Sequence, residues 1–326
     1  MSVSRREFLE AASLASLAAG SLAAATTAKS GLPTRILGKT GARVSILAFG
    51  SGSRFLMYKE EDKALEAITR ALDLGITYVD TADDYGRGHL SEQRIGTAIR
   101  GRRDSIFLAT KLSSRDGNES RRIVEESLKA LQVDRLDLLH IHALTTEDDL
   151  AKIEAKGGPL DQILKMRDQK MTRFIGITCH ADPSVLKTAL ERHDFDCTQM
   201  ALNAGSVAMS NGKGGMVPNP AMKTSFETLA LPVALRKKMG VIGMKVFAQD
   251  ALIGQSTPEK LLYYTLSLPV AAAVVGMPKP EHIEDNIRMA KAFRPLPPAE
   301  MKRMSAMLSE KNKEALDRFF LTHLDA

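Results

Sequence analysis

The chain has 326 residues, of which 44% are hydrophobic and 26% are charged, which suffices for one large soluble domain with a sizeable core. Its net charge of +6 is spread along the sequence, without runs of like charge or basic residues interleaved with aromatic ones, which argues against nucleic-acid binding. The two cysteines, Cys179 and Cys197, are too few for a disulfide framework and suit small buried positions.

The N-terminus has the layout of an export signal. Ser4-Arg5-Arg6-Glu7-Phe8-Leu9 precedes an alanine- and leucine-rich stretch, residues 11–25, that ends in Ala23-Ala24-Ala25, a small-residue cleavage pattern. A paired arginine followed by such a stretch indicates the twin-arginine (Tat) translocation machinery as a partner. The stretch is too short and too rich in alanine for stable membrane insertion. We therefore expect residues 1–28 to be a signal segment and the protein to be periplasmic or otherwise exported, or cytoplasmic if the signal is not used. The alternative is an ordinary N-terminal helix.

Apolar, β-branched runs alternate with helical patterns over the rest of the chain. We predict eight strands, each followed by a helix, the first of which ends at Gly75. The predicted strands are Val44–Gly50, Thr77–Thr81, Ile106–Lys111, Leu136–His142, Phe174–Thr178, Thr198–Asn203, Val241–Val246 and Ala271–Gly276. The helices that follow them are predicted at Asp62–Leu74, Ser91–Ile99, Glu119–Leu131, Leu160–Gln169, Pro183–Arg192, Thr228–Met239, Pro258–Ser267 and Glu281–Phe293.

Strands without polar alternation are typical of a parallel sheet that is buried on both faces. Eight such strand–helix units predict an α/β protein of the (β/α)8, or TIM-barrel, class that spans residues 32–326. Two turn glycines between Arg35 and Val44 predict an N-terminal β-hairpin that closes the bottom of the barrel, and a helix near Ala299–Leu316 is expected beyond the eighth unit. The long segment Ala204–Ser225 is a candidate lid or binding loop.

Polar residues of complementary chemistry stand at the ends of three successive predicted strands. Asp80 lies near the end of the second strand and Tyr85 follows it, Lys111 ends the third, and His142 ends the fourth. The carboxyl ends of barrel strands meet at one rim, which is where barrel enzymes build their active sites. A lysine that ends an apolar strand needs a partner, and together these four residues predict proton donation to a carbonyl oxygen.

These residues belong to an ordered set that resembles the aldo-keto reductase family over about residues 32–293. The set comprises Asp80–Gly86 (DTADDYG), Ser91–Gly96, Lys111, Asp137–His142, Arg173–Thr178, Gln199, Val275-Gly276 and Glu284–Asn286. The resemblance implies a hydride transfer to an aldehyde or ketone from the reduced form of NADP, or of NAD as the alternative. It also implies the roles of the tetrad: Tyr85 as general acid, Lys111 as the cation that lowers the pKa of Tyr85, Asp80 as the partner of Lys111, and His142 as the group that orients the substrate oxygen.

The resemblance also implies where the cofactor binds, with departures from the family pattern. Thr178-Cys179 replace a Ser-Asn pair, Met244 replaces a stacking tyrosine, and Lys245 replaces a serine and offers a point charge for the pyrophosphate. After the eighth strand, Gly276 and His282 stand where many members have residues that bind the adenosine phosphate, which weakens the preference for NADP over NAD. The full set of expected cofactor contacts is Thr178, Cys179, Gln199, Met244, Lys245, Phe247, Gly276, His282 and Asn286.

Two other functions compete with the reductase. The altered cofactor positions suit a non-catalytic nicotinamide-binding sensor or partner subunit. His140 and His142 leave their strand on the same face, so a metallohydrolase site with Asp80 or His180 is a weaker alternative. We expect no metal, and we interpret His140 as a hydrogen-bonded histidine of the barrel interior. The sequence leaves the substrate and the oligomeric state open.

Overall fold

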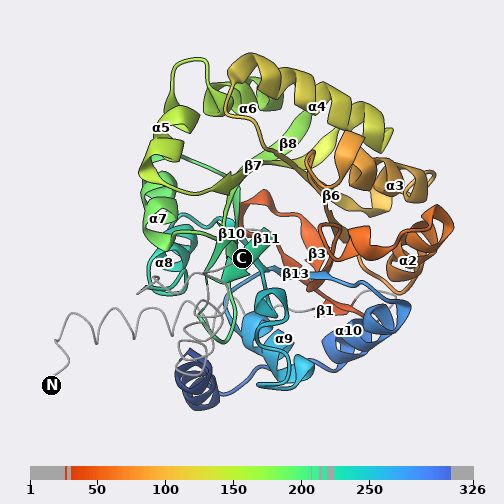
Figure 1. The fold of residues 1–326 in the computed structure, drawn as a ribbon, viewed down its shortest axis with the longest axis vertical. Coiled ribbons are helices and arrows are strands. Elements are labelled where there is room, and N and C mark those ends of the chain that lie inside the picture. Colours follow the sequence, from red (N-terminus) through yellow and green to blue (C-terminus); the bar gives the residue numbers. More distant parts are fainter. Residues whose placement is uncertain (1–25, 28–30, 207, 213–214, 219–223, 310–326) are drawn as a thin grey trace, which may run out of the picture.

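The computed structural model describes residues 26–27, 31–206, 208–212, 215–218 and 224–309. Its centre is a closed barrel of eight parallel strands, surrounded by helices (Figure 1). In barrel order the strands are β12 (Gly240–Met244), β13 (Ala272–Gly276), β4 (Leu47–Gly50), β5 (Tyr78–Asp80), β6 (Phe107–Leu112), β7 (Leu136–Leu144), β8 (Thr172–Cys179) and β9 (Cys197–Ala201). The predicted (β/α)8 class is confirmed, and the eight predicted strands each overlap one strand of the barrel.

The helices form the outer ring and cover the barrel strands with their apolar faces (Figure 1). They are α2 (Glu61–Asp73), α3 (Leu90–Ala98), α4 (Gly117–Leu131), α5 (Glu147–Glu154), α6 (Pro159–Asp168), α7 (Pro183–Arg192), α8 (Ala230–Arg236), α9 (Pro258–Ser267) and α10 (Pro280–Ala292). Residues 298–309 are also helical, as predicted, and the rest of that predicted helix lies outside the described residues. Among the described residues, no helix is long and apolar enough to cross a membrane.

A β-hairpin closes the bottom of the barrel, where the strands begin. It joins β2 (Pro33–Ile36) to β3 (Arg43–Ser45), and the short β1 (Thr26–Thr27) adds to β2. The turn of the hairpin is fixed to the start of β12, because the Lys39 N–H donates to the Lys238 carbonyl over 2.7 Å. The predicted first strand was too long: Val44 belongs to the hairpin, and the barrel strand begins at Leu47.

Apolar side chains fill the lower half of the barrel interior. The rings of Tyr78, Phe107 and Phe174 stack in sequence, with centroids 5.4 and 6.3 Å apart. Leu37 from the hairpin and Leu138 belong to the same buried cluster. Side chains therefore close the lower end of the barrel. The polar residues of the sequence motifs lie at the other end, where the strands finish.

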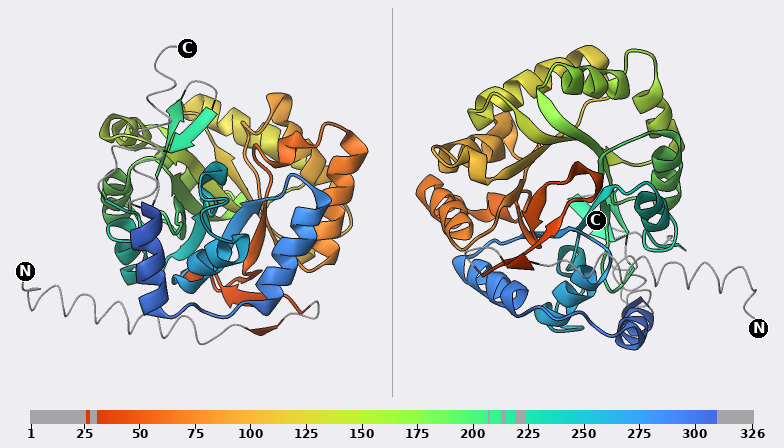
Figure 2. Two further views of the ribbon diagram at one scale, coloured as in Figure 1. Left: turned by 60° about the horizontal axis from the view of Figure 1, so that its bottom comes forward. Right: turned by 180° about the vertical axis from the view of Figure 1, so that it is seen from behind.

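The long segment after β9 carries a second hairpin, made of β10 (Met209–Gly212) and β11 (Gly215–Pro218). This hairpin (green) stands at the opposite end of the barrel from the N-terminal β-hairpin (red), as the left view of Figure 2 shows. Its strand β11 contacts the short 3-10 helix η5 (Ala248–Asp250), which follows β12. The segment that was predicted as a loop therefore contains secondary structure, and it adjoins an element that borders the main cavity.

Candidate active site

A cavity of about 960 Å³ opens at the carboxyl ends of the barrel strands. Its wall comes from residues at the ends of β4, β5, β7, β9, β12 and β13 and from the loops that follow them. Ten of the thirteen predicted site residues line it: Asp80, Tyr85, His142, Gln199, Met244, Lys245, Phe247, Gly276, His282 and Asn286. Lys111, Thr178 and Cys179 are the three that do not.

Asp80 and Lys111 form a buried ion pair in the floor of the cavity. The Lys111 ammonium donates to Asp80 Oδ2 over 2.7 Å and to the Thr81 carbonyl over 2.6 Å, and the exposed fractions of the two side chains are 1% and 2%. Burial by itself lowers the pKa of Lys111, but the charge of Asp80 and that of Tyr85 outweigh burial and raise it. Lys111 is therefore a permanent cation beneath the cavity.

Tyr85 lies directly against this cation, with its ring centroid 4.7 Å from Lys111 Nζ and its hydroxyl hydrogen-bonded to Lys111. The loop that carries Tyr85 is held by Ser91, whose N–H donates to the Tyr85 carbonyl over 3.0 Å and whose hydroxyl donates to the Ser51 carbonyl over 2.9 Å. Burial raises the pKa of Tyr85, and Lys111 opposes that rise without cancelling it. The expected influence of Lys111 is present, but the net direction is upward because the phenol is enclosed.

His142 stands at the end of β7 and completes the tetrad. Its ring packs edge-on against Tyr85, with centroids 5.6 Å apart and an interplanar angle of 76°. The main chain beyond it is fixed by Arg115, whose guanidinium donates to the His142 carbonyl over 2.8 Å. The structure therefore brings Asp80, Tyr85, Lys111 and His142 together on one side of the cavity.

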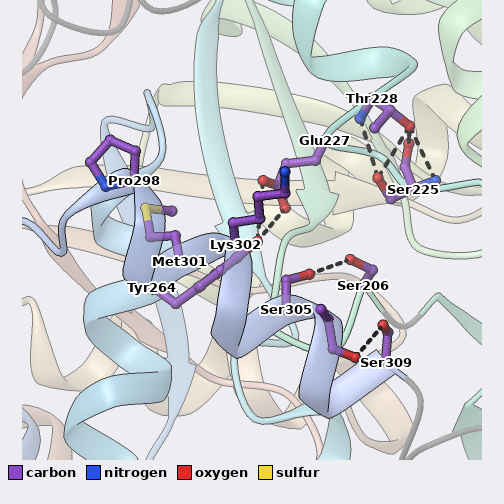
Figure 3. Close-up of a pocket in the computed structure, with 11 residues that line it drawn as sticks. Ser206, Ser225, Glu227, Thr228, Tyr264, Pro298, Met301, Lys302, Ser305 and Ser309 are labelled. Carbon is purple, nitrogen blue, oxygen red and sulfur yellow. Dashed lines mark hydrogen bonds between the residues drawn. The ribbon is translucent and has the colours of Figure 1, made fainter. Parts of the chain in front are cut away.

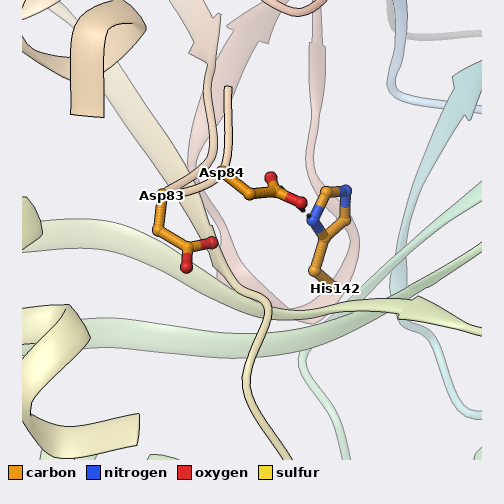
Figure 4. Close-up of side chains that lie close together, drawn as sticks. All are labelled: Asp83, Asp84 and His142. Atoms are coloured by element: carbon orange, nitrogen blue, oxygen red, sulfur yellow. Dashed lines mark ion pairs between the residues drawn. The ribbon is translucent and has the colours of Figure 1, made fainter. Parts of the chain in front are cut away.

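Asp84, which was not among the predicted site residues, also contacts His142. Asp84 Oδ1 lies 3.2 Å from His142 Nδ1 (Figure 4). Asp83, Asp84 and His142 have potential ligand atoms within 4.8 Å of one another, but Asp83 accepts a hydrogen bond from the Ser113 hydroxyl and Asp84 pairs with the imidazole. We interpret the cluster as an ion pair beside a hydrogen-bonded carboxylate.

His140 does not join this cluster, so the pairing that motivated the metallohydrolase alternative is not found among the described residues. The ring of His140 is fully buried and fills the space beside Gly176, where an added Cβ would lie 2.4 Å from Nδ1. Neither ring nitrogen has a hydrogen-bond partner within the described part of the chain, which corrects the expectation of a hydrogen-bonded histidine. Burial, assisted by the charge of Lys111, lowers the pKa of His140 well below the usual histidine value.

Of the predicted nicotinamide contacts on β8 and β9, only Gln199 lines the cavity. Gln199 faces the cavity, with Nε2 3.5 Å from Asp80 Oδ2 and 3.6 Å from the Met244 sulfur. The Thr178 hydroxyl accepts a hydrogen bond from the Ala143 N–H over 2.7 Å and so holds the end of β7. Cys179 points the opposite way, because its thiol donates to the Leu144 carbonyl within the core under the helices. Its side chain does not reach the cavity, in contrast to the expectation.

Lys245 lines the cavity and carries a desolvated ammonium group. Burial, together with the nearby charges of Lys111 and Arg54, lowers the pKa of Lys245 to about 8. Among the described residues, none forms a hydrogen bond or an ion pair with its ammonium. An unpaired, desolvated cation in a cavity favours an anionic ligand group.

Other charged or titratable residues also line the cavity, and of these only His180 was named from the sequence, as a possible ligand in the metallohydrolase alternative. Arg54, after β4, forms an ion pair with Asp250 of η5, and both residues border the cavity. His180 lies beyond the end of β8, and burial, with the charge of Lys245, lowers the pKa of its imidazole to about 3. No local motif identifies these residues, because their positions depend on how the loops fold back.

A second cavity lies outside the barrel, beside the helix formed by residues 298–309 (Figure 3). Its polar side chains bond one another: the Tyr264 hydroxyl donates to the Glu227 carboxylate over 3.0 Å, and the hydroxyls of Ser206 and Ser305 are 3.3 Å apart. Burial raises the pKa of Glu227. None of the tetrad residues borders this cavity.

With the fold and the tetrad established, comparison with known proteins identifies the family. Residues 47–211, about half of the chain, match the model of the aldo/keto reductase family. The chain belongs to this family of oxidoreductases.

Curated relatives match much of the chain, and solved structures share its fold. An uncharacterized oxidoreductase of Bacillus subtilis, YqkF, is 28% identical over 303 residues, which cover 80% of this chain and 92% of that protein. The L-galactose dehydrogenase of Arabidopsis thaliana is 35% identical over 164 residues, which cover 44% of this chain and 47% of that protein. The holo form of the aldo-keto reductase AKR11C1 from Bacillus halodurans has a TM-score of 0.68 at 22% identity, over 85% of this chain and 96% of that chain. An aldo-keto reductase from Klebsiella pneumoniae, solved with NADPH, has a TM-score of 0.66 at 20% identity, over 84% of this chain and 94% of that chain.

Proposed function

We propose that this protein reduces an aldehyde or ketone to an alcohol with NADPH, and that Tyr85 is the general acid. The observation that carries the proposal is the buried array in which Asp80 holds Lys111 at 2.7 Å and Lys111 lies against the ring and hydroxyl of Tyr85. A cation beneath a phenol stabilises the phenolate that remains once the proton has been given up. His142, edge-on to Tyr85, orients the substrate oxygen.

The cavity fits a nicotinamide dinucleotide, which supplies the hydride when it is bound. Gln199 has a buried side-chain oxygen without a partner among the described residues, and this oxygen suits the donor of a carboxamide. Met244 and Phe247 border the same space and offer apolar surface to a ring. Gly276, His282 and Asn286 line the far end, towards which a phosphate would extend. NADP is favoured over NAD because a Schizosaccharomyces pombe relative, 30% identical over 168 residues, is named as an NADP(+) aldo-keto reductase.

The pyrophosphate role of Lys245 predicts that cofactor binding depends on pH. The pKa of Lys245 is lowered to about 8, and an anion bound to its ammonium favours the protonated form. The dissociation constant of NADPH should therefore rise as the pH increases through about 8 to 9.5, as the free protein loses this charge. In Lys245→Met the affinity should be lower below pH 8, by roughly tenfold for one desolvated charge-assisted contact, and should change little with pH. Fluorescence titration gives the dissociation constant of NADPH for the parent and for Lys245→Met at each pH. If the two proteins show the same dependence on pH, Lys245 does not bind the pyrophosphate.

We also propose that residues 1–28 direct export through the twin-arginine machinery, so that the protein acts outside the cytoplasm. The support is the Ser4-Arg5-Arg6 motif and the alanine-rich stretch after it. Replacing both arginines by lysine should retain the full-length protein in the cytoplasm, as seen by cell fractionation. Equal export of the parent and the double variant would exclude this route.

The reductase proposal is tested with purified protein, a panel of aldehydes and ketones, and NADPH or NADH. Loss of absorbance of the reduced cofactor should depend on both the carbonyl compound and the protein, and NADPH should be used more efficiently. Tight binding of the cofactor without turnover across the panel would instead favour the sensor or partner-subunit function.

A further inference from the structure

The described carboxylates that line the main cavity are all engaged by basic side chains other than Lys245. Asp80 contacts Lys111, Asp84 contacts His142, Asp250 contacts Arg54, and Asp285 contacts Arg288. Lys245 lines the same cavity, and among the described residues none forms a hydrogen bond or an ion pair with its side chain. The described wall of the cavity therefore leaves Lys245 without an acidic partner.

The backbone holds Lys245 just after β12 in a conformation that residues with side chains rarely adopt. Its φ angle is +58°, in the left-handed region, and positive φ angles recur nearby at Ala248, Gln249 and Asp250. The turn is closed by the Ala248 N–H, which donates to the Lys245 carbonyl over 2.8 Å. Such conformations are unfavourable and persist where the surrounding structure imposes them, commonly at functional sites. The fold thus keeps this lysine at the cavity wall against a local backbone preference.

An unpaired lysine in a cavity has a second chemistry besides binding anions, because its unprotonated amine is a nucleophile. Burial, with the charges of Lys111 and Arg54, lowers the pKa of Lys245 to about 8. At about pH 7.5 roughly a quarter of the molecules therefore carry the free amine, compared with about one in a thousand for an ordinary lysine. Lys111 differs, because the charges of Asp80 and Tyr85 outweigh its burial and raise its pKa.

We propose that Lys245 is a covalent modification site, at which the amine of the cofactor-free protein condenses with a small aldehyde to form a Schiff base. The nitrogen lone pair attacks the carbonyl carbon and forms the C–N bond. The carbonyl oxygen then leaves as water, taking both hydrogens of the amine, and a C=N bond remains. No oxidant or reductant takes part, and water reverses the step.

The modification competes with the cofactor for the same side chain. A Schiff base at Lys245 occupies the nitrogen that is proposed above to meet the pyrophosphate. Conversely, an anion bound to the ammonium favours its protonated form, which is not a nucleophile. Aldehydes should therefore block the cofactor-free protein, and NADPH should protect it. This competition rests on the proposed function, whereas formation of the Schiff base does not.

Reductive trapping tests the site without requiring turnover. Purified protein is incubated at about pH 7.5 with benzaldehyde and sodium cyanoborohydride, which reduces a Schiff base to a stable secondary amine, and peptide mass spectrometry locates the label. Lys245 should be labelled at least about tenfold faster than Lys63 or Lys237, because more of its amine is unprotonated. Lys63 is the exposed control. Lys237 is the half-buried control, and its ammonium donates to the Leu190 and His193 carbonyls over 2.7 Å.

A variant and the cofactor complete the test. Lys245→Met should lose the major label and keep the slow labelling of Lys63 and Lys237. NADPH at ten times its dissociation constant should slow labelling of Lys245 about tenfold and leave Lys63 unchanged. Labelling of Lys245 no faster than that of Lys63 would overturn the proposal.

The remaining outcomes separate this proposal from the proposed function. Fast labelling of Lys245 that NADPH does not slow would support the modification site and contradict the pyrophosphate role. Fast labelling of Lys245 in a protein that turns over no carbonyl compound would likewise support the site, while the reductase function fails.

Discussion

Lys111→Met is expected to destabilise the protein by about 3–5 kcal/mol, because it leaves the Asp80 carboxylate buried without its partner. The parent pair has a separation of 2.7 Å and almost no exposure, so water does not replace the lost ammonium. Denaturant unfolding followed by circular dichroism measures the loss as a lower midpoint with an unchanged slope. Turnover should fall as well, because Tyr85 loses the cation beneath it.

A second variant separates stability from catalysis. In Lys111→Met with Asp80→Asn no charge remains buried, so much of the stability should return while activity stays low. Lys63→Met is the exposed control: it removes a surface ion pair with Glu66 and should leave both properties unchanged. A stable and fully active Lys111→Met protein would show that the buried cation contributes neither to stability nor to catalysis.

Tyr85→Phe is expected to lower kcat by about 10²–10⁴, the usual contribution of a positioned general acid. The phenyl ring keeps its packing against His142, so the fold and the dissociation constant of NADPH should match those of the parent. Steady-state assays of carbonyl reduction and fluorescence titration of NADPH measure the two quantities separately.

Tyr263→Phe provides the matched control for loss of a tyrosine hydroxyl. The Tyr263 hydroxyl donates to the Met289 carbonyl over 3.0 Å in the packing between α9 and α10, away from the tetrad. This variant should lose some stability and retain turnover. If Tyr85→Phe reduces carbonyl compounds as fast as Tyr263→Phe, another group supplies the proton.

The barrel was predictable because the alternation of apolar strand patterns with helical patterns along the sequence matches the alternation of strands and helices in the fold. The bounds of α7 and α9 were predicted to the residue, since each begins with a proline at its first position after a capping side chain, Asp182 or Thr257. The helix α5 was missed because it is short and half of its residues are acidic, with Leu150 and Ile153 as its buried residues. The break between β3 and β4 was missed because both strands are apolar, and pattern alone does not reveal where a chain leaves one sheet for another.

The tetrad was predictable for a related reason: its residues lie at or just after the ends of parallel strands, so chain order specifies their position on the rim. Contacts between loops were not predictable. Asp84 is adjacent to Tyr85 in sequence, yet its contact with His142 depends on the turn after β5. The ion pair between Arg54 and Asp250 joins loops 196 residues apart. Cys179 illustrates the alternation within a strand, because Thr178 and Cys179 direct their side chains to opposite faces of β8.

The most direct test of the central claim is a crystal structure of the parent protein with NADPH and an unreactive carbonyl compound. The account predicts that the carbonyl oxygen lies within hydrogen-bonding reach, about 2.6–3.2 Å, of the Tyr85 hydroxyl, with the Lys111 ammonium behind it. The carbonyl carbon should be about 3–3.5 Å from the hydride-bearing carbon of the nicotinamide. A bound carbonyl oxygen that contacts a different proton donor, with Tyr85 directed away from it, would contradict the account.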